Sequence, residues 1–318
     1  MHQPVSRVMG GPEAAPVAVR YGLSYRGFFS EFNILAYAYA DCLAQGRRLF
    51  LDPWKSSTPW RELFSNFPPG VEALDPRAYA NIIDLYPKAK DRAWQAMRRR
   101  VRDACLERRV ISVAELDFEG TFDQLVFRAA GELFTPRESL RAEAAAAIRG
   151  LGLDQAPFCA VQIRRGDKTE GYVNNGELVV EAAASSFEVY ADCIGRLAPD
   201  VRDVFVLTDD YGAFEEARAS HPQYRFHTLC TPEERGYFHV DHLARPPQEA
   251  LKDVRKLIVT VMLARTSQAF VGTYWSNLST AVCMLHANRA RCASIDLSQD
   301  WPSLDPLFLP GRDSLGVR

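Results

Sequence analysis

Strand-length apolar runs alternate with longer segments of helical periodicity along the chain. Residues 17–22 and 48–51 are apolar runs of strand length. Between them, residues 28–45 have apolar side chains at helical spacing, and Gly46 marks the end of the helix; the apolar positions are Phe28, Phe32, Leu35, Tyr39 and Leu43. The order strand, helix, strand predicts the beginning of a parallel sheet.

The rest of the first half has weaker signals. Residues 53–87 are rich in Pro, Trp and Asn, which predicts irregular structure. Residues 91–109 have a helical pattern with several arginines, and we expect a solvated basic helix face there. Two more helices are predicted at 122–134 and 137–150. The second should begin at Thr135-Pro136, with the threonine as cap and the proline in the first helical position.

From residue 157 onwards, buried strands and helices alternate regularly. This pattern predicts a doubly wound α/β domain, in which ligands bind beyond the carboxyl ends of the parallel strands. The expected strands are 158–163, 203–207, 225–229, 269–272 and 291–295, and the expected helices are 186–197, 211–220, 249–265 and 276–286. We therefore expect a flexible segment at 1–20, an N-terminal α/β domain at 21–150 and a C-terminal domain at 151–318.

Length and composition fit this organisation. A chain of 318 residues exceeds most single-core domains, and its 47% hydrophobic and 25% charged residues are ordinary for a folded enzyme. A net charge of −2 argues against a nucleic-acid partner. Seven cysteines without a C-x-x-C pair disfavour a structural metal site and fit a reducing compartment. Residues 1–16 lack a signal-peptide core and the apolar runs are short, so we expect a cytoplasmic protein with no integral membrane segment.

A charged motif follows the first strand of the second half. The run Gln162-Ile163-Arg164-Arg165-Gly166-Asp167-Lys168 places two guanidinium groups, an ammonium group and a carboxylate at a strand end. Arginine forks match phosphate oxygens bidentately, so this charge suits a diphosphate leaving group. A surface ion-pair cluster around Asp167 is the alternative. The strand-end position favours the functional interpretation.

Three further segments contain polar residues at the end of a predicted strand or at the beginning of a predicted helix. In Thr208-Asp209-Asp210, at a strand end, the carboxylates can bind a metal, cap the next helix or orient hydroxyl groups, and capping and function are equally supported. Thr273-Tyr274-Trp275-Ser276 precedes a helix whose free N–H groups attract an anion, and Ser276 adds a hydroxyl. Tyr25-Arg26-Gly27 opens the first helix, where glycine permits close approach of a phosphate.

These motifs together resemble the α1,6-fucosyltransferases, meaning the N-glycan core enzymes and the nodulation enzymes, and more distantly the protein O-fucosyltransferases. The family's His-x-Arg-Arg-x-Asp-Lys motif corresponds to 162–168, its Thr-Asp-Asp motif to 208–210, and its Thr-Phe-Ser-Ser motif to 273–276 behind Ser267-Gln268. The resemblance runs from about Tyr21 to about Leu297. The chain has no complete G-x-G-x-x-G, Walker, H-E-x-x-H or G-x-S-x-G motif that would point to another enzyme class.

The resemblance implies a GT-B fold, with two Rossmann-like α/β domains facing a central cleft and GDP-fucose bound to the C-terminal domain. It implies that the acceptor lies on the side of the N-terminal domain, where residues 53–87 fall. By position in the matched motifs, the residues expected to bind the donor are Arg26, Gly27, Gln162, Arg164, Arg165, Thr273 and Ser276. Those expected to line the acceptor and catalytic pocket are Lys168, Asp209 and Asp210, and no metal or cofactor is implied.

The chain departs from the family pattern at three places. Gln162 stands where the family has histidine. The aspartate that reads guanine in the family falls at Thr260, and Asp253, two turns earlier, is the candidate in its place. The base follows Asp-Lys within a few residues in the family, so Glu170 and Glu177 compete for that role, with Glu170 favoured. These departures leave the guanine specificity and the base open.

The resulting expectation is an inverting, metal-independent fucosyltransferase. A carboxylate takes the proton of an acceptor hydroxyl while GDP departs, and Arg164, Arg165 and the helix start at Ser276 stabilise the developing charge. The acceptor implied by the resemblance is a glycan that contains N-acetylglucosamine. The alternatives are a GT-B enzyme for another nucleotide sugar, a non-catalytic glycan-binding relative and a nucleoside-phosphate regulatory module.

Overall fold

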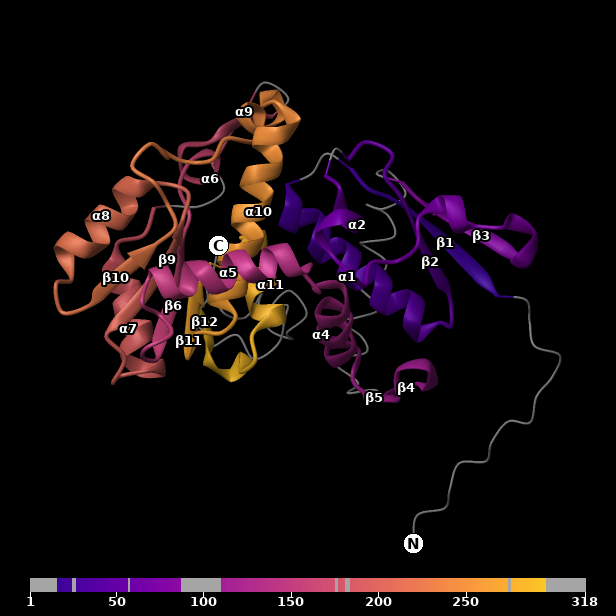
Figure 1. Cartoon of the computed structure of the whole chain (residues 1–318), viewed down its shortest axis with the longest axis horizontal. Helices are drawn as coiled ribbons and strands as arrows, with labels where there is room; N and C mark the ends of the chain where they lie inside the picture. Colours follow the sequence, from indigo (N-terminus) through magenta and orange to yellow (C-terminus); the bar gives the residue numbers. More distant parts are fainter. Residues whose placement is uncertain are drawn as a thin grey trace, which may run out of the picture.

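The computed structural model describes residues 16–24, 27–56, 58–86, 110–174, 177–180, 184–273 and 276–295. Figure 1 shows two halves side by side along the long axis of the molecule, each built around a parallel sheet. Elements from both halves, α1, α10 and α11 among them, lie between the sheets. The predicted α/β class with two parallel sheets is confirmed.

The N-terminal sheet has the strand order β2-β1-β3. Its strands β1 (Val17–Gly22), β2 (Arg48–Asp52) and β3 (Asn81–Leu85) are all parallel, and α1 (Phe28–Ala44) connects the first two as predicted. The irregular structure predicted for 53–87 is wrong at β3. This strand is short and only half-buried, so it lacks the apolar run by which a buried strand is recognised.

Short elements fill the chain between these strands and the second half. After β2 come α2 (Trp60–Leu63) and two single turns, η1 (Val71–Ala73) and η2 (Pro76–Ala78). The basic helix expected at 91–109 lies outside the described residues. A two-stranded hairpin, β4 (Ile111–Val113) and β5 (Phe118–Gly120), contains the turn η3 (Ala114–Leu116).

Helices α4 (Phe122–Leu133) and α5 (Glu138–Gly150) follow at the predicted places, but the predicted start of α5 is wrong. Arg137 is its N-cap, and the Thr135 hydroxyl instead accepts a hydrogen bond of 3.0 Å from the backbone N–H of Asn66. Pro136 forms an isolated antiparallel β-bridge with Phe64, so Thr135-Pro136 connects the beginning of α5 to the segment after α2.

The C-terminal sheet has five parallel strands in the order β10-β9-β6-β11-β12. They are β6 (Phe158–Ile163), β9 (Asp203–Thr208), β10 (Arg225–Thr228), β11 (Ala269–Gly272) and β12 (Cys292–Ser294). The predicted helices are α7 (Phe187–Leu197), α8 (Tyr211–Ser220), α10 (Pro247–Ala264) and α11 (Asn277–Leu285). All nine elements lie within two residues of their predicted bounds.

The sequence did not predict five small elements of this half. They are the single-turn helix α6 (Asp167–Glu170), the hairpin of β7 (Tyr172–Asn174) and β8 (Glu177–Val179), the helix α9 (His239–Ala244) and the turn η4 (Arg289–Arg291). Each has six residues or fewer, which is too short for a periodicity to be recognised. Two of them, α6 and α9, adjoin the candidate site.

One hydrophobic core joins the two halves. It runs from Phe32 of α1 through Leu133 of α4 to Ile258 of α10 and Met284 of α11. At the edge of this core, Asn33 of α1 donates a hydrogen bond of 2.9 Å to the backbone oxygen of Asn277, the first residue of α11. The domain boundary expected near residue 150 stays a prediction.

Two bulk properties concern the described residues. Six cysteines, Cys42, Cys159, Cys193, Cys230, Cys283 and Cys292, are free and buried. No helix in the described ranges has the length and apolar character needed to cross a membrane.

Candidate functional site

The first two sequence motifs meet at the carboxyl ends of β6 and β9. These strands are hydrogen-bonded neighbours, and their last residues, Ile163 and Thr208, are partners in register. The turn 164–167 and the pair Asp209-Asp210 therefore leave the sheet side by side. This is the edge where ligands of parallel α/β sheets bind.

Arg164 lies at the centre of this edge. Its Nη1 contacts Asp209 and its Nη2 donates to Oδ1 of Asp167 at 2.6 Å. The guanidinium carbon lies 5.1 Å from the centre of the Tyr237 ring, within the range of a cation–π contact. With only 19% of its side chain exposed, Arg164 is held on two edges by carboxylates and on one face by an aromatic ring.

The two aspartates of the second motif have different partners. Asp209 accepts a hydrogen bond of 2.9 Å from each of two backbone N–H groups, those of Arg165 and Tyr237, besides its contact with Arg164. Asp210 accepts one of 2.8 Å from the backbone N–H of Gly212 and is the N-cap of α8. Asp210 thus makes the capping contact that the sequence left open, while Asp209 holds the arginine turn together.

Arg165 has looser surroundings than Arg164. Its contacts with described residues are at 3.4 Å to the backbone oxygens of Arg164 and Ser185, and at 3.5 Å to the carboxylate of Glu216. The side chain is 15% exposed. Because each of these contacts is long, the Arg165 guanidinium keeps donors for an anionic ligand.

Helix α6 carries the remaining candidates of the first motif. Lys168 is half-buried and Glu170 is exposed, so the favoured base is accessible from solvent. Glu177 begins β8, and its side chain lies outside what the structure describes.

A segment that the sequence did not single out, residues 234–239, covers the arginine turn. The backbone N–H of Asp167 donates to the carbonyl oxygen of Tyr237 at 3.0 Å, and that of Gly236 donates to the carbonyl oxygen of Asp209 at 2.8 Å. In the sequence its only distinguishing mark is a glycine next to an aromatic residue, and such pairs are common in loops.

Tyr237 and His239 form a second layer behind Arg164. The Tyr237 hydroxyl and His239 Nδ1 are 3.2 Å apart. Burial raises the pKa of Tyr237 to about 12, and the nearby Arg164 opposes this shift. Burial also lowers the pKa of His239, with a further contribution from the neighbouring His242. The phenol of Tyr237 therefore stays protonated throughout the physiological range.

The third motif is joined to the first through Gln162. This side chain is 2% exposed and accepts hydrogen bonds from the hydroxyl of Ser279 at 2.7 Å and from that of Thr273 at 3.4 Å. It therefore faces the interior and connects β6 to the beginning of α11. Ser276 is the N-cap of α11, with its hydroxyl oxygen 3.5 Å from the backbone N–H of Ser279.

The other predicted donor contacts are more scattered. Gly27 is the N-cap of α1, whereas Arg26 lies outside the described residues. Asp253 of α10 accepts a hydrogen bond of 2.6 Å from Arg245, and its carboxylate lies 3.7 Å from Nδ1 of His242. Thr260 is buried and donates to the backbone oxygen of Lys256 within the helix.

The carboxyl end of the N-terminal sheet is aromatic. Asp52, the last residue of β2, accepts hydrogen bonds from the Tyr86 hydroxyl and from the backbone N–H of Trp54. The Trp54 side chain is 43% exposed, its backbone has a φ of 26°, and the Lys55 ammonium lies 4.6 Å from the centre of its ring. A positive φ at tryptophan is costly and persists only where the surroundings enforce it.

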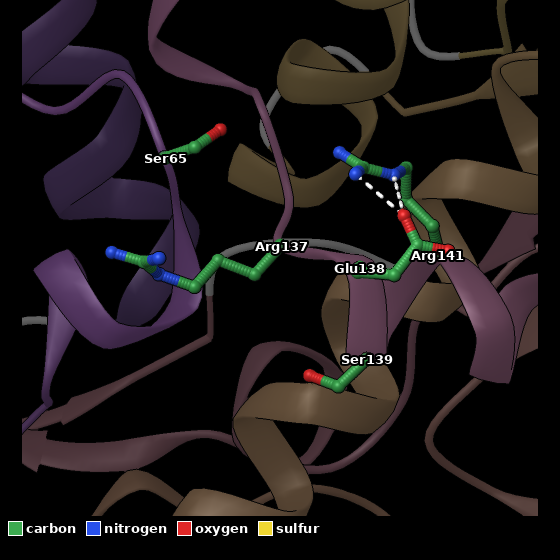
Figure 2. Close-up of a pocket in the computed structure, with 5 residues that line it drawn as sticks. All are labelled: Ser65, Arg137, Glu138, Ser139 and Arg141. Atoms are coloured by element: carbon green, nitrogen blue, oxygen red, sulfur yellow. Dashed lines mark hydrogen bonds and ion pairs between the residues drawn. The ribbon is translucent and has the colours of Figure 1, made fainter.

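A surface pocket of about 400 Å³ lies elsewhere, where α5 begins. Figure 2 shows Arg137, Ser65 and Ser139 around its opening, and the ion pair of Glu138 with Arg141 beside them. Its polar groups are already paired within the protein, since Arg137 donates to the backbone oxygen of Arg61. None of its lining residues belongs to the predicted site.

Comparison with known proteins supports the fold. No protein-family model matches the chain, and no curated sequence matches it. The solved structure of an Arabidopsis thaliana FUT1 variant in complex with GDP is 13% identical, with 89% of this chain and 71% of that chain covered and a TM-score of 0.51. This likeness, together with the two parallel sheets, confirms the predicted α/β fold of GT-B type.

Two other solved structures are similar over most of their length. NodZ α-1,6-fucosyltransferase soaked with GDP-fucose is 14% identical, with 86% of this chain and 93% of that chain covered and a TM-score of 0.47. POFUT1 in complex with GDP is 12% identical, with 89% and 98% covered and a TM-score of 0.48. At such identities a structural likeness concerns the fold, and function has to be argued from the site.

Proposed function

We propose that this chain is an inverting, metal-independent glycosyltransferase that transfers fucose from GDP-fucose to a hydroxyl group of a glycan acceptor. The observation that carries the proposal is the arginine turn at the end of β6. There Arg164 is fixed by two carboxylates, and Arg165 and Lys168 lie beside it at the ligand-binding edge of a parallel sheet. The fold is shared with a protein solved in complex with GDP.

The proposed donor site has three parts. Arg165 supplies a guanidinium fork for the diphosphate, and Arg164 presents its remaining donors from a fixed position. The beginning of α11 at Ser276 adds backbone N–H groups and the positive end of a helix dipole. Fixed charges of this kind stabilise a departing GDP without reorganisation, and such electrostatic stabilisation is usually the largest single contribution to catalysis.

The partners of the aspartates support metal independence. Both oxygens of Asp209 accept hydrogen bonds from arginine or backbone N–H groups, and Asp210 caps α8. These donors take most of the lone pairs that the Asp209 carboxylate could offer a metal ion. In the described part of the chain, no three His, Cys, Asp or Glu side chains are grouped so that they could hold a metal ion.

In the proposed reaction, the acceptor oxygen bonds to the anomeric carbon of fucose as the bond from that carbon to the β-phosphate oxygen breaks. The electron pair of the broken bond leaves with GDP. Glu170, exposed at the end of α6, takes the proton of the acceptor hydroxyl as general base. The exposed ring of Trp54, at the end of the N-terminal sheet, is suited to pack against the apolar face of an acceptor sugar.

One observation favours a second candidate, an enzyme of the same fold that uses another nucleotide sugar. Asp253, the candidate for reading guanine, is hydrogen-bonded to Arg245, and the buried Thr260 bonds within its own helix. Both side chains are thus already hydrogen-bonded within the protein, which does not favour recognition of guanine.

Donor assays separate the candidates. The protein is incubated with GDP-fucose, GDP-mannose or a UDP-sugar, with and without mixed glycan acceptors, in the presence of EDTA or Mn²⁺. We expect GDP release and glycan fucosylation with GDP-fucose alone, unchanged by EDTA. Turnover of a UDP-sugar would support the second candidate. Loss of activity in EDTA with recovery in Mn²⁺ would disprove metal independence, and binding of glycans without turnover of any donor would indicate a non-catalytic relative.

A further inference from the structure

We name residues 234–239 the clamp segment. Its backbone donates hydrogen bonds to Asp167 and Asp209, the two carboxylates that accept from Arg164. The backbone N–H of Tyr237 donates to Asp209 at 2.9 Å, and that of His239 donates to Asp167 at 3.3 Å. Bonds between the backbone of the clamp segment and the two strand ends run alongside these contacts. Arg164 is therefore oriented by a segment some seventy residues away in the chain.

Two glycines bring the clamp segment this close. Gly166 has a φ of 64°, and a Cβ atom there would lie 2.5 Å from the backbone N and O of Tyr237. Gly236 has a φ of 96°, and its Cβ would lie 2.8 Å from the Cα of Gly166. Both the backbone conformation and the space exclude a side chain at either position, so the two turns are in backbone contact.

The Tyr237 ring completes the enclosure of Arg164. Asp167 and Asp209 take two edges of the guanidinium, and the ring covers one of its faces at 5.1 Å. The ring itself is anchored by the backbone bonds on both sides of Tyr237 and by the contact of its hydroxyl with His239. A planar group restrained on two edges and one face keeps a single orientation.

We propose that Tyr237 is a positioning residue whose ring fixes the plane of the Arg164 guanidinium, so that its free edge faces the diphosphate of the donor. The inference rests on the proposed function, because it assigns Arg164 to the diphosphate. Orienting the fork in advance lowers the entropic cost of binding, as it does for preorganised sites in general.

Binding of GDP to the full chain, measured by calorimetry, tests the proposal. A cation–π contact of this kind corresponds to about a threefold to thirtyfold change in affinity, so Tyr237→Leu should weaken GDP binding by that factor. Tyr237→Phe keeps the ring over the guanidinium and loses only the contact of the hydroxyl with His239. The Kd of this variant for GDP should therefore stay within about twofold of the value for the unchanged protein. Tyr224→Leu removes a ring that packs at the other end of the same sheet, against Phe187 and Phe226, and should leave GDP affinity unchanged.

A double-mutant cycle distinguishes positioning from a general structural role. In an Arg164→Ala background the ring has no guanidinium to orient, so Tyr237→Leu should then change GDP affinity by less than about twofold. If Tyr237→Leu weakens GDP binding equally in both backgrounds, or not at all in the unchanged protein, the proposal is wrong.

The orientation itself can be observed without any ligand. In ¹⁵N-arginine NMR spectra, the Arg164 guanidinium should show slowly exchanging, ring-shifted Nη signals that are lost in Tyr237→Leu and retained in Tyr237→Phe. Arg164 signals that are identical in the Leu variant would overturn the proposal. If the spectra behave as expected but the unchanged protein binds no GDP, the assignment of Arg164 to the diphosphate fails and the proposed function fails with it, while the positioning of Arg164 by Tyr237 stands.

Discussion

Each end of the C-terminal sheet has an ion pair between an aspartate and an arginine, but the arginine is exposed at one end and largely buried at the other. At the amino end, Asp203 begins β9 and accepts from Nε of Arg225 and from Nε2 of His227, both at 2.9 Å and both on β10. At the carboxyl end, Asp209 and Asp167 hold Arg164 with the help of the clamp segment. The Arg225 side chain is 68% exposed, against 19% for Arg164.

The difference separates a stabilising cluster from a site. Both partners of Asp203 named above lie on the neighbouring strand, so this cluster joins two adjacent strands. The carboxyl end instead brings together three segments distant in the chain and places Arg165, Lys168 and Glu170 around them. Because both ends contain comparable ion pairs, matched substitutions at the two ends test which of them serves binding.

The largest effect is expected from Arg164→Ala. Removing a fixed donor to a developing oxyanion costs about a hundredfold or more in turnover, so kcat for fucose transfer should fall at least that far. Arg164→Lys should restore little, since the planar fork is lost. Arg225→Ala is the matched control at the amino end and should keep kcat. If Arg164→Ala has the kcat of the unchanged protein, the carboxyl end is not the donor site.

Glu170→Gln should have a comparable effect on kcat with a different signature. The amide keeps the size of the side chain and removes its basicity, so kcat should fall by about a hundredfold while the Kd of GDP stays nearly unchanged. The same change at Glu177 should be mild. A fall in kcat at Glu177 alone would transfer the role of base to that residue, and full activity in both variants would place the base elsewhere.

A smaller loss is expected from Asp209→Asn. The amide keeps a hydrogen-bond acceptor but loses the charge that faces Arg164, so the arginine turn loosens and kcat/KM for the donor should fall by about tenfold. Asp203→Asn is its counterpart at the amino end and should leave kcat/KM unchanged. Equal losses of kcat/KM in the two variants would show that the two ends do not differ in function.

Much of this arrangement could be predicted from the sequence, and the clamp segment could not. The bounds of β6 were predicted because a strand buried along its whole length gives an apolar run, and those of α8 because its buried side chains recur at helical spacing. That Arg164 and Asp209 lie at the same edge of the sheet followed from their positions directly after two strands of one parallel sheet. The clamp segment has no periodicity, and its course depends on backbone bonds to Asp209 and Asp167, which only the folded chain brings near.

The same limit applies to the assignment of individual roles. The sequence left capping and function equally open for Asp209 and Asp210, and only the position of the backbone N–H of Gly212 shows that Asp210 is a cap. Gln162 was placed in the donor site by its motif. The structure turns its side chain toward Ser279 of α11, the helix that follows β11, and β11 is a neighbour of β6 in the sheet.

The smallest expected effect concerns stability at the amino end and its dependence on pH. The hydrogen bond from Arg225 lowers the pKa of Asp203, against the opposing effect of burial and with a further lowering by His227. A carboxyl with a lower pKa in the folded than in the unfolded chain stabilises the fold when ionised. Its contribution is therefore fully present above the unfolded pKa of about 3.9 and is lost as the pH falls through the folded value.

Because Arg225 is largely exposed, solvent screens the pair, and Asp203→Asn should lower the free energy of unfolding by only about 1 kcal/mol at pH 7. The free energies of unfolding of the two proteins, measured from urea curves, should converge as the pH falls through the lowered folded pKa of Asp203, below which the aspartate is protonated in both the folded and the unfolded chain. A difference that stays constant from pH 7 to pH 2 would mean that the charge of Asp203 is not what stabilises this end. A difference that grows as the pH falls would contradict the direction of the pKa shift, and with it the role of Arg225 as the partner that holds Asp203 ionised.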